Sequence, residues 1–283
     1  MQQQIIKVKN KKGNHVIPGF GLSMGVTITL LGLVVLIPLA SIALTASKLS
    51  PGEFIEIVTD KQIVHGYMVS LSCALAAALI NSVFGVILAL VLVRYDFPCK
   101  RIVDGMIELP FALPTAVAGI ALTSLYVDQG WIGSIFDKAG IKIAYTTVGI
   151  TIAMIFIGIP FIVRSIQPVL EKLDKEYEEA AAILGAARSR IFFKVILPEI
   201  FPAMLTGFGL ALARGIGEYG SVVFIAGNIP YETQIAPLLI VSKLEQYKYA
   251  DATAIALVLL VISFLILLFL NIIQIRTSKY TNS

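Results

Sequence analysis

The chain has 283 residues, of which 57% are hydrophobic and 14% are charged. In soluble globular domains about a quarter of the residues are charged, so this composition excludes an ordinary water-soluble fold and predicts a protein that lies in lipid. The net charge of +4 does not indicate nucleic-acid binding, because the basic residues are dispersed between apolar runs and form no patch with interleaved aromatic side chains.

Six apolar stretches are long enough to be membrane spans, since a helix needs about 20 apolar residues to cross the hydrocarbon layer. The first stretch follows a polar, basic segment and is too long for the core of a cleavable signal, so we expect it to be retained. The sequence therefore predicts an all-α, polytopic membrane protein with six transmembrane helices. In chain order the predicted spans are 16–47, 62–93, 109–127, 143–163, 200–226 and 252–275.

The lysines and arginines predict which way these spans run. Short cytoplasmic loops retain positive charge, and most of the basic residues lie on one side of the membrane when the N-terminus is placed inside. Both termini are then cytoplasmic. The predicted organisation is a cytoplasmic tail at 1–18, a six-helix transmembrane domain at 19–276 and a second cytoplasmic tail at 277–283.

Several predicted spans contain proline or closely spaced glycine. Pro110 and Pro114 interrupt the third span, and Gly215 and Gly217 lie in the fifth. Proline bends a membrane helix where neighbouring groups satisfy the freed carbonyls, and small residues let helix backbones approach closely. These residues predict either a bent bundle that lines a cavity or simple close packing of helices.

The longest inner segment, 164–199, contains the signals of a short helix of its own. Asp174 is a suitable N-cap, acidic residues follow it in the first turns, and Gly185 is a suitable stop. Such a helix fits either a groove on a soluble partner or the lipid interface. An apolar stripe is predicted at helical spacing, formed by Leu173, Tyr177, Ala180, Ala181 and Leu184.

Glu179, Ala180, Ala181 and Gly185 are followed at a fixed distance by Leu197 and Pro198. This pattern resembles the EAA loop of the membrane subunits of bacterial ABC importers, except that Val195 stands where that loop has isoleucine. The resemblance implies that 171–198 is a coupling loop and that 177–185 docks into a cleft on a separate ATP-hydrolysing subunit. The ATP and magnesium would then be held by that partner, with no cofactor in this chain. The residues carried over as docking residues are Tyr177, Glu179, Ala180, Ala181, Gly185, Leu197 and Pro198.

Residues 211–256 resemble the sulfate permease subset in particular, in the T-type subunits of type I ABC importers. The stretch at 243–247 favours sulfate or thiosulfate over molybdate or tungstate. The resemblance implies several partners: a homologous permease subunit of the W type, two ATP-binding subunits, an extracytoplasmic sulfate-binding protein and membrane lipid. The expected location is a bacterial plasma (inner) membrane, with an algal plastid membrane as the alternative.

Arg214 and Glu218 are the charged pair within a predicted span. On a helix, residues four apart share one face and can form an ion pair. Charges in a span usually face the bundle interior or a wet cavity, so Arg214 is a candidate for the anion path, with Glu218 holding it or closing a gate. The alternative is a helix-locking salt bridge that never meets substrate. The outer loops 128–143 and 227–251 are predicted to dock the binding protein, or else simply connect spans.

Other signals are set aside. No P-loop occurs, so we expect a non-catalytic subunit that depends on a partner for ATP hydrolysis. Gly215, Gly217 and Gly220 fit a dinucleotide-binding spacing but follow no strand. His15 and His65 lack the spacing of metal ligands. The EAA-like segment also disfavours a secondary anion transporter, which would show inverted repeats, and an intramembrane enzyme, which would need paired catalytic groups.

Overall fold

The computed structural model describes residues 19–281, with side chains through Ile275, and every regular element in this range is a helix. The tail predicted at 1–18 lies outside the described residues. The first half of the described chain consists of α1 (Phe20–Leu31), the π-helical turn η1 (Gly32–Leu36), α2 (Ile37–Ala46), α3 (Pro51–Val58), α4 (Lys61–Arg94), α5 (Lys100–Ala112), α6 (Thr115–Tyr126) and α7 (Gly133–Asp137).

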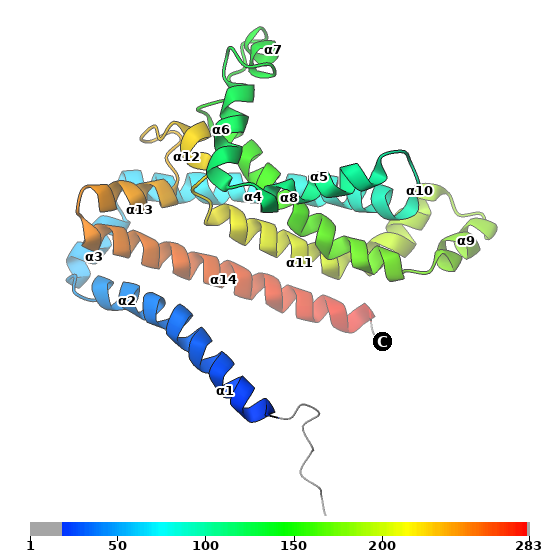
Figure 1. Cartoon of the computed structure of the whole chain (residues 1–283), viewed down its shortest axis with the longest axis horizontal. Coiled ribbons are helices and arrows are strands. Elements are labelled where there is room, and N and C mark those ends of the chain that lie inside the picture. The colour runs from blue at the N-terminus through cyan, green and yellow to red at the C-terminus, as the bar shows by residue number, and fades with distance from the viewer. Residues whose placement is uncertain (1–18, 282–283) are drawn as a thin grey trace, which may run out of the picture.

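Long helices dominate the second half as well. Most of the short helices that join them lie at the two ends of the bundle (Figure 1). The elements are α8 (Thr147–Lys172), α9 (Lys175–Ile183), α10 (Arg188–Ile191), the π-helical turn η2 (Phe192–Ile196), α11 (Leu197–Ile216), α12 (Val222–Ala226), α13 (Ala236–Glu245) and α14 (Tyr249–Thr281). The last helix therefore continues beyond the boundary predicted at 276.

The core lies where α4, α8 and α11 pack together, and small residues allow the close approach. A Cβ added at Gly85 of α4 would lie 2.5 Å from Cγ2 of Ile162, and one added at Gly207 of α11 would lie 2.8 Å from Cα of the same residue. Ile162 of α8 is fully buried. Since lipid tails are as apolar as these side chains, the contact is stabilised by close van der Waals packing.

The number of spans follows from how α4 and α8 are oriented. Arg94 at the end of α4 donates from Nη2 to the carbonyl of Leu173 at the end of α8, at 3.0 Å. Sγ of Cys73, in the first half of α4, lies 3.6 Å from the carbonyl of Thr147 at the start of α8. The two helices therefore run parallel, and the chain between them must cross the membrane in the opposite direction. The prediction of six spans is confirmed by five long apolar helices and one bent pair.

That bent pair corrects the predicted third span. In place of one helix over 109–127, α5 and α6 meet at an angle of 113°. Leu113 is extended, with ψ 136°, as expected before proline, and Pro114 is the N-cap of α6. The prediction also missed α5, because charged side chains such as Asp104 and Glu108 interrupt its hydropathy.

Two other predicted spans differ from the helices that contain them. The fourth span was expected to end at 163, but α8 continues to Lys172, so Arg164 lies on a helix and not in a loop. The fifth was expected over 200–226, but its helix begins at Arg188 and ends at Ile216. The helix ends there because Gly217 closes it and the buried side chain of Glu218 turns the chain toward α12.

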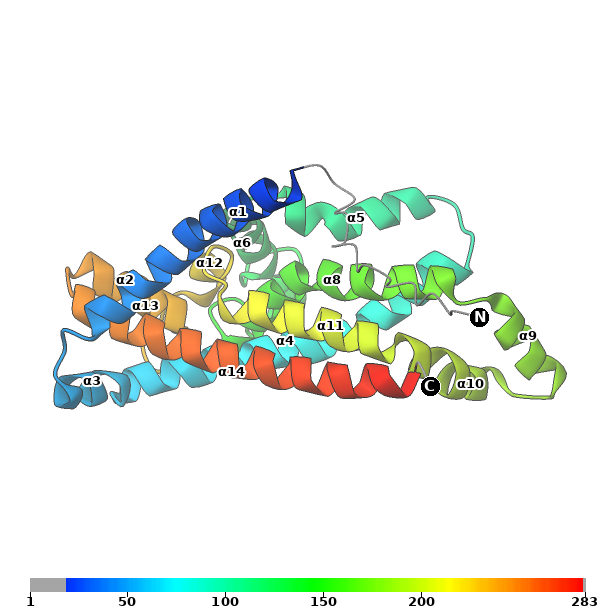
Figure 2. The same cartoon turned by 90° about the horizontal axis from the view of Figure 1, so that it is seen from below.

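The first span, Phe20–Ala46, lies apart from the core. Among its described residues only Ala46 is buried, and Figure 1 shows α1 diverging from α14 while α2 stays beside it. Figure 2 shows α9 and α10 at one end of the bundle and α3 and α13 at the other. We name these the α9 end and the α3 end. A helix that is apolar on all sides fits a lipid or subunit contact.

Candidate functional site

The α9 end carries the short helix that the sequence predicts. Asp174 caps it by accepting a hydrogen bond from the backbone N–H of Glu176 at 3.1 Å, and Glu176 and Glu178 lie in its first turn. Acidic groups there are favoured by the partial positive charge of a helix N-terminus. Both the cap and the acidic first turn are confirmed.

Gly185 ends α9 through a Schellman motif. Its φ of +83° is left-handed, a conformation that glycine adopts without steric cost. The N–H of Gly185 donates to the carbonyl of Ala182 at 2.9 Å, and the N–H of Ala186 donates to that of Ala181 at 3.0 Å. These two bonds satisfy carbonyls that a helix end leaves without partners. The stop predicted at Gly185 is therefore confirmed.

The outer side of α9 presents large apolar side chains to solvent. Ile183 is 85% exposed, Leu184 88% and Tyr177 63%. Ala181 instead packs against the core, so the stripe predicted from helical spacing is divided between two sides of the helix. Exposed apolar side chains on a short helix that projects from the bundle are suited to bind a groove on another protein.

The docking residues predicted from the resemblance do not form one cluster. Tyr177, Glu179, Ala180 and Gly185 are exposed on or just after α9. Leu197 and Pro198 instead begin α11, where Leu197 packs against the core. Ile183 lies within the predicted docking segment 177–185 but was not among the residues named for it. Its exposure could not be read from the sequence, because an apolar residue in an amphipathic helix is normally expected to face inward.

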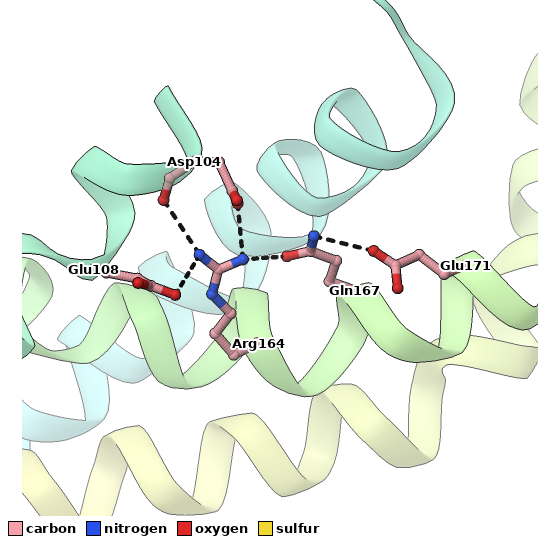
Figure 3. A network of polar contacts seen from close by, with 5 residues as sticks. All are labelled: Asp104, Glu108, Arg164, Gln167 and Glu171. Carbon is pink, nitrogen blue, oxygen red and sulfur yellow. Dashed lines mark hydrogen bonds and ion pairs between the residues drawn. The ribbon is translucent and has the colours of Figure 1, made fainter. Parts of the chain in front are cut away.

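Close to this end, Arg164 of α8 holds α5 in place (Figure 3). Its Nη1 lies 2.7 Å from Oδ1 of Asp104, and its Nη2 lies 2.7 Å from Oε1 of Glu108. Gln167 also accepts a hydrogen bond from Nη1 of Arg164 and donates one to Glu171. Two carboxylates one helical turn apart on α5 are thus bound by one planar guanidinium, a geometry that suits arginine better than lysine.

The predicted pair of Arg214 and Glu218 forms an ion pair of 2.5 Å between Nη1 and Oε2. The two residues are not on one continuous helix, because α11 ends at Ile216. Glu218 is 1% exposed, and its Oε1 accepts hydrogen bonds from both N and Oγ of Ser221, at 2.8 and 3.0 Å. The carboxylate therefore organises the turn after α11, while the guanidinium of Arg214 stays partly exposed.

The break after α11 packs against the break between α5 and α6. A Cβ at Gly220 would collide with Oγ1 of Thr115, and a Cβ at Gly119 would collide with the backbone of Ser221. Only glycine permits contacts this close. Two interrupted spans thus meet beside Arg214, and neighbouring Gly217 is exposed. Irregular backbone at membrane depth is tolerated only where protein covers it or water fills a cavity.

The predicted outer loops are partly built into the fold. Within 128–143 the structure forms α7, and Trp131 beside it is highly exposed. Within 227–251 it forms α13, whose first four residues are buried. Oε1 of Gln234, just before α13, accepts a hydrogen bond from Nε2 of Gln62 on α4 at 2.6 Å. Part of the second loop is therefore buried in the bundle, and its docking role stays a prediction.

A family model described as "Binding-protein-dependent transport system inner membrane component" matches residues 81–279. The chain belongs to this family. Salmonella typhimurium contains a relative named sulfate transport system permease protein CysT, which is 45% identical over 94% of this chain and 96% of its own length. In Chlorokybus atmophyticus, a probable sulfate transport system permease protein cysT is 49% identical over 90% of this chain and 89% of its own.

A solved structure shows the same fold. It is a chain of a bacterial alginate ABC transporter, determined in complex with an alginate pentasaccharide-bound periplasmic protein. The similarity covers 92% of this chain and 95% of that chain, with a TM-score of 0.76 and 19% sequence identity. The prediction of an all-α polytopic protein that resembles type I ABC importer permeases is confirmed.

Proposed function

We propose that this chain is a translocation subunit of an ATP-driven importer for sulfate or thiosulfate. The observation that carries the proposal is α9, a capped helix that projects from the membrane bundle and exposes Ile183 and Leu184. It occurs in a chain of the binding-protein-dependent transport family, and the relatives named above are called sulfate permeases. A membrane subunit that moves its cargo at the expense of ATP needs such a contact when it has no P-loop of its own.

In this proposal α9 binds an ATP-binding subunit on the cytoplasmic side of a bacterial inner membrane, or of a plastid membrane as the alternative. Two such subunits hold the ATP and magnesium, and an extracytoplasmic sulfate-binding protein delivers the anion at the α3 end. ATP and the loaded binding protein each shift the equilibrium between conformations of the assembly. The size of each shift is set by how differently the ligand binds the two conformations. The chain itself catalyses no reaction.

The translocation path is proposed to run beside Arg214, at the break after α11. A homologous second permease of the W type would cover this face, since the exposed backbone around Gly217 cannot face lipid. The partly exposed guanidinium can attract a dianion. Glu218 does not repel that anion strongly, because its charge is buried and paired with Arg214 and Ser221.

Uptake into proteoliposomes tests the proposal. The purified assembly is reconstituted, and accumulation of labelled sulfate is measured with ATP, or with a non-hydrolysable ATP analogue, on the α9 side. We expect labelled sulfate to accumulate with ATP but not with the analogue, and unlabelled thiosulfate to inhibit this accumulation. Sulfate uptake that does not depend on ATP would contradict the importer class. Accumulation of molybdate or tungstate but not of sulfate would keep the class and overturn the substrate.

A further inference from the structure

Three helices meet at the side chain of Arg94, the last residue of α4. Its Nη2 lies 3.0 Å from the carbonyl of Leu173, the C-cap of α8, and 2.8 Å from Oε1 of Glu178 on α9. One guanidinium at the end of α4 thus contacts the end of α8 and the first turn of the projecting helix.

The electrostatics of helix ends explain why a cation is held here. The last carbonyls of α4 and α8 have no partner within their own helices, and each C-terminus carries partial negative charge. The Arg94 side chain is only 11% exposed, so solvent and salt screen its interactions less than those of a surface pair.

Glu178 differs from the other acidic residues of α9. It is partly buried and directed at α4, whereas Glu176 and Glu179 are exposed. The inward residue Ala181 adds only a small apolar contact. Among the described residues, the pair of Arg94 and Glu178 is the ion pair that connects α9 to a membrane-spanning helix.

From Arg94, α4 leads directly to the candidate path. Its Ala74 packs against Gly215 of α11, where an added Cβ would lie 3.2 Å from the alanine Cβ. Gly215 is adjacent to Arg214. Further along α4, Oγ of Ser70 accepts a hydrogen bond from the N–H of Ala236 near the α3 end. A displacement of α4 therefore reaches both the break beside Arg214 and the opposite end of the bundle.

We propose that Arg94 and Glu178 form the joint through which movement of α9 displaces α4 and α8. They are positioning residues for coupling and do not contact the anion. This inference rests on the proposed docking of an ATP-binding subunit to α9. It assigns a transmitting role to residues on the inner side of that helix, separate from the outer side that binds the partner.

A double-mutant cycle tests this joint. The variants are Arg94→Gln, Glu178→Gln and both together, with Glu176→Gln as a control that removes the same charge from an exposed position on the same turn. For each reconstituted assembly we measure sulfate imported per ATP hydrolysed, a ratio that does not depend on how much complex assembles. Affinity of the permease for the ATP-binding subunit is measured in parallel.

Each single variant is expected to lower sulfate imported per ATP about tenfold, while the control and the affinity for the ATP-binding subunit stay unchanged. The double variant should lose no more than either single one, because both remove the same interaction. Three results would overturn the joint: a Glu178→Gln ratio equal to that of the control, losses that multiply in the double variant, or loss of affinity with an unchanged ratio. Failure of the unmutated permease to bind the ATP-binding subunit would instead contradict the proposed function.

Discussion

Replacing Gly185 with alanine tests the docking role of α9 through backbone strain alone. Gly185 has φ +83°, and a Cβ added there would meet no atom within 4 Å. The substitution therefore introduces no collision and leaves only the left-handed conformation, which costs a non-glycine residue about 1–2 kcal/mol. The last turn of α9 can relieve this strain by unwinding, which displaces Ile183 and Leu184.

If those side chains bind the ATP-binding subunit, the strain appears as lost affinity. About 1–2 kcal/mol corresponds to a roughly 5- to 30-fold weaker complex. Affinity would be measured with the permease in lipid nanodiscs, using labelled ATP-binding subunit. Gly185→Asn is the matched control, because asparagine tolerates the left-handed region better than alanine. Its loss of affinity for the ATP-binding subunit should therefore be clearly smaller.

An affinity of Gly185→Ala equal to that of the unmutated chain would refute the reasoning, since it would mean that the end of α9 does not contact the partner. An asparagine variant as weak as the alanine variant would show that side-chain bulk, and not backbone strain, is responsible. Thermal unfolding of the bundle should be unaffected by either substitution, because Gly185 is exposed and lies outside the core.

Three further outcomes are expected. Gly119→Val should destabilise the permease by about 1–3 kcal/mol by forcing α6 away from the backbone of Ser221, seen as a lower unfolding temperature in detergent; unchanged unfolding would contradict the close contact. Glu218→Ala should destabilise it by about 2–3 kcal/mol, since two buried donors of Ser221 lose their acceptor; a loss of uptake without any loss of stability would instead indicate a direct role in the path. At the start of α3, hydrogen bonds from the backbone N–H and then from the hydroxyl of Ser50 lower the pKa of Glu53. Because the pKa is lowered, the ionised Glu53 stabilises the helix above the unfolded-state pKa, and this stabilisation disappears as pH falls through the folded-state pKa. Amide hydrogen exchange in α3 should therefore accelerate in acid. Exchange that does not depend on pH, after correction for intrinsic rates, would contradict this prediction.

Helix α9 illustrates what local sequence signals can predict. Asp174, the acidic first turn and Gly185 act within a few residues of one another, so the start and stop of α9 follow from the chain alone. The direction in which each side chain faces does not follow from the sequence. Ala181 faces the core while Ile183 faces solvent, and this depends on how the bundle holds α9.

At the candidate path, the tertiary structure decides more than the local sequence does. Spacing alone predicts that Arg214 and Glu218 interact, and they do. It suggests one helix as the reason, whereas the pair lies across the end of α11, held by Ser221. The contact of Thr115 with Gly220 could not be predicted either, because it joins two breaks that are distant in the chain.

By itself, then, the sequence determines the membrane class, the six crossings and the start and stop of α9, because hydropathy and helix caps act over one span or a few residues. Tertiary structure decides where the spans break and which charges belong to helices. The sequence predicts Arg164 to be a loop residue, whereas the structure places it on α8 beside Asp104 and Glu108 of α5. Charges within membrane spans are usually paired, and the partners of Arg164 are brought to it by the packing of another helix.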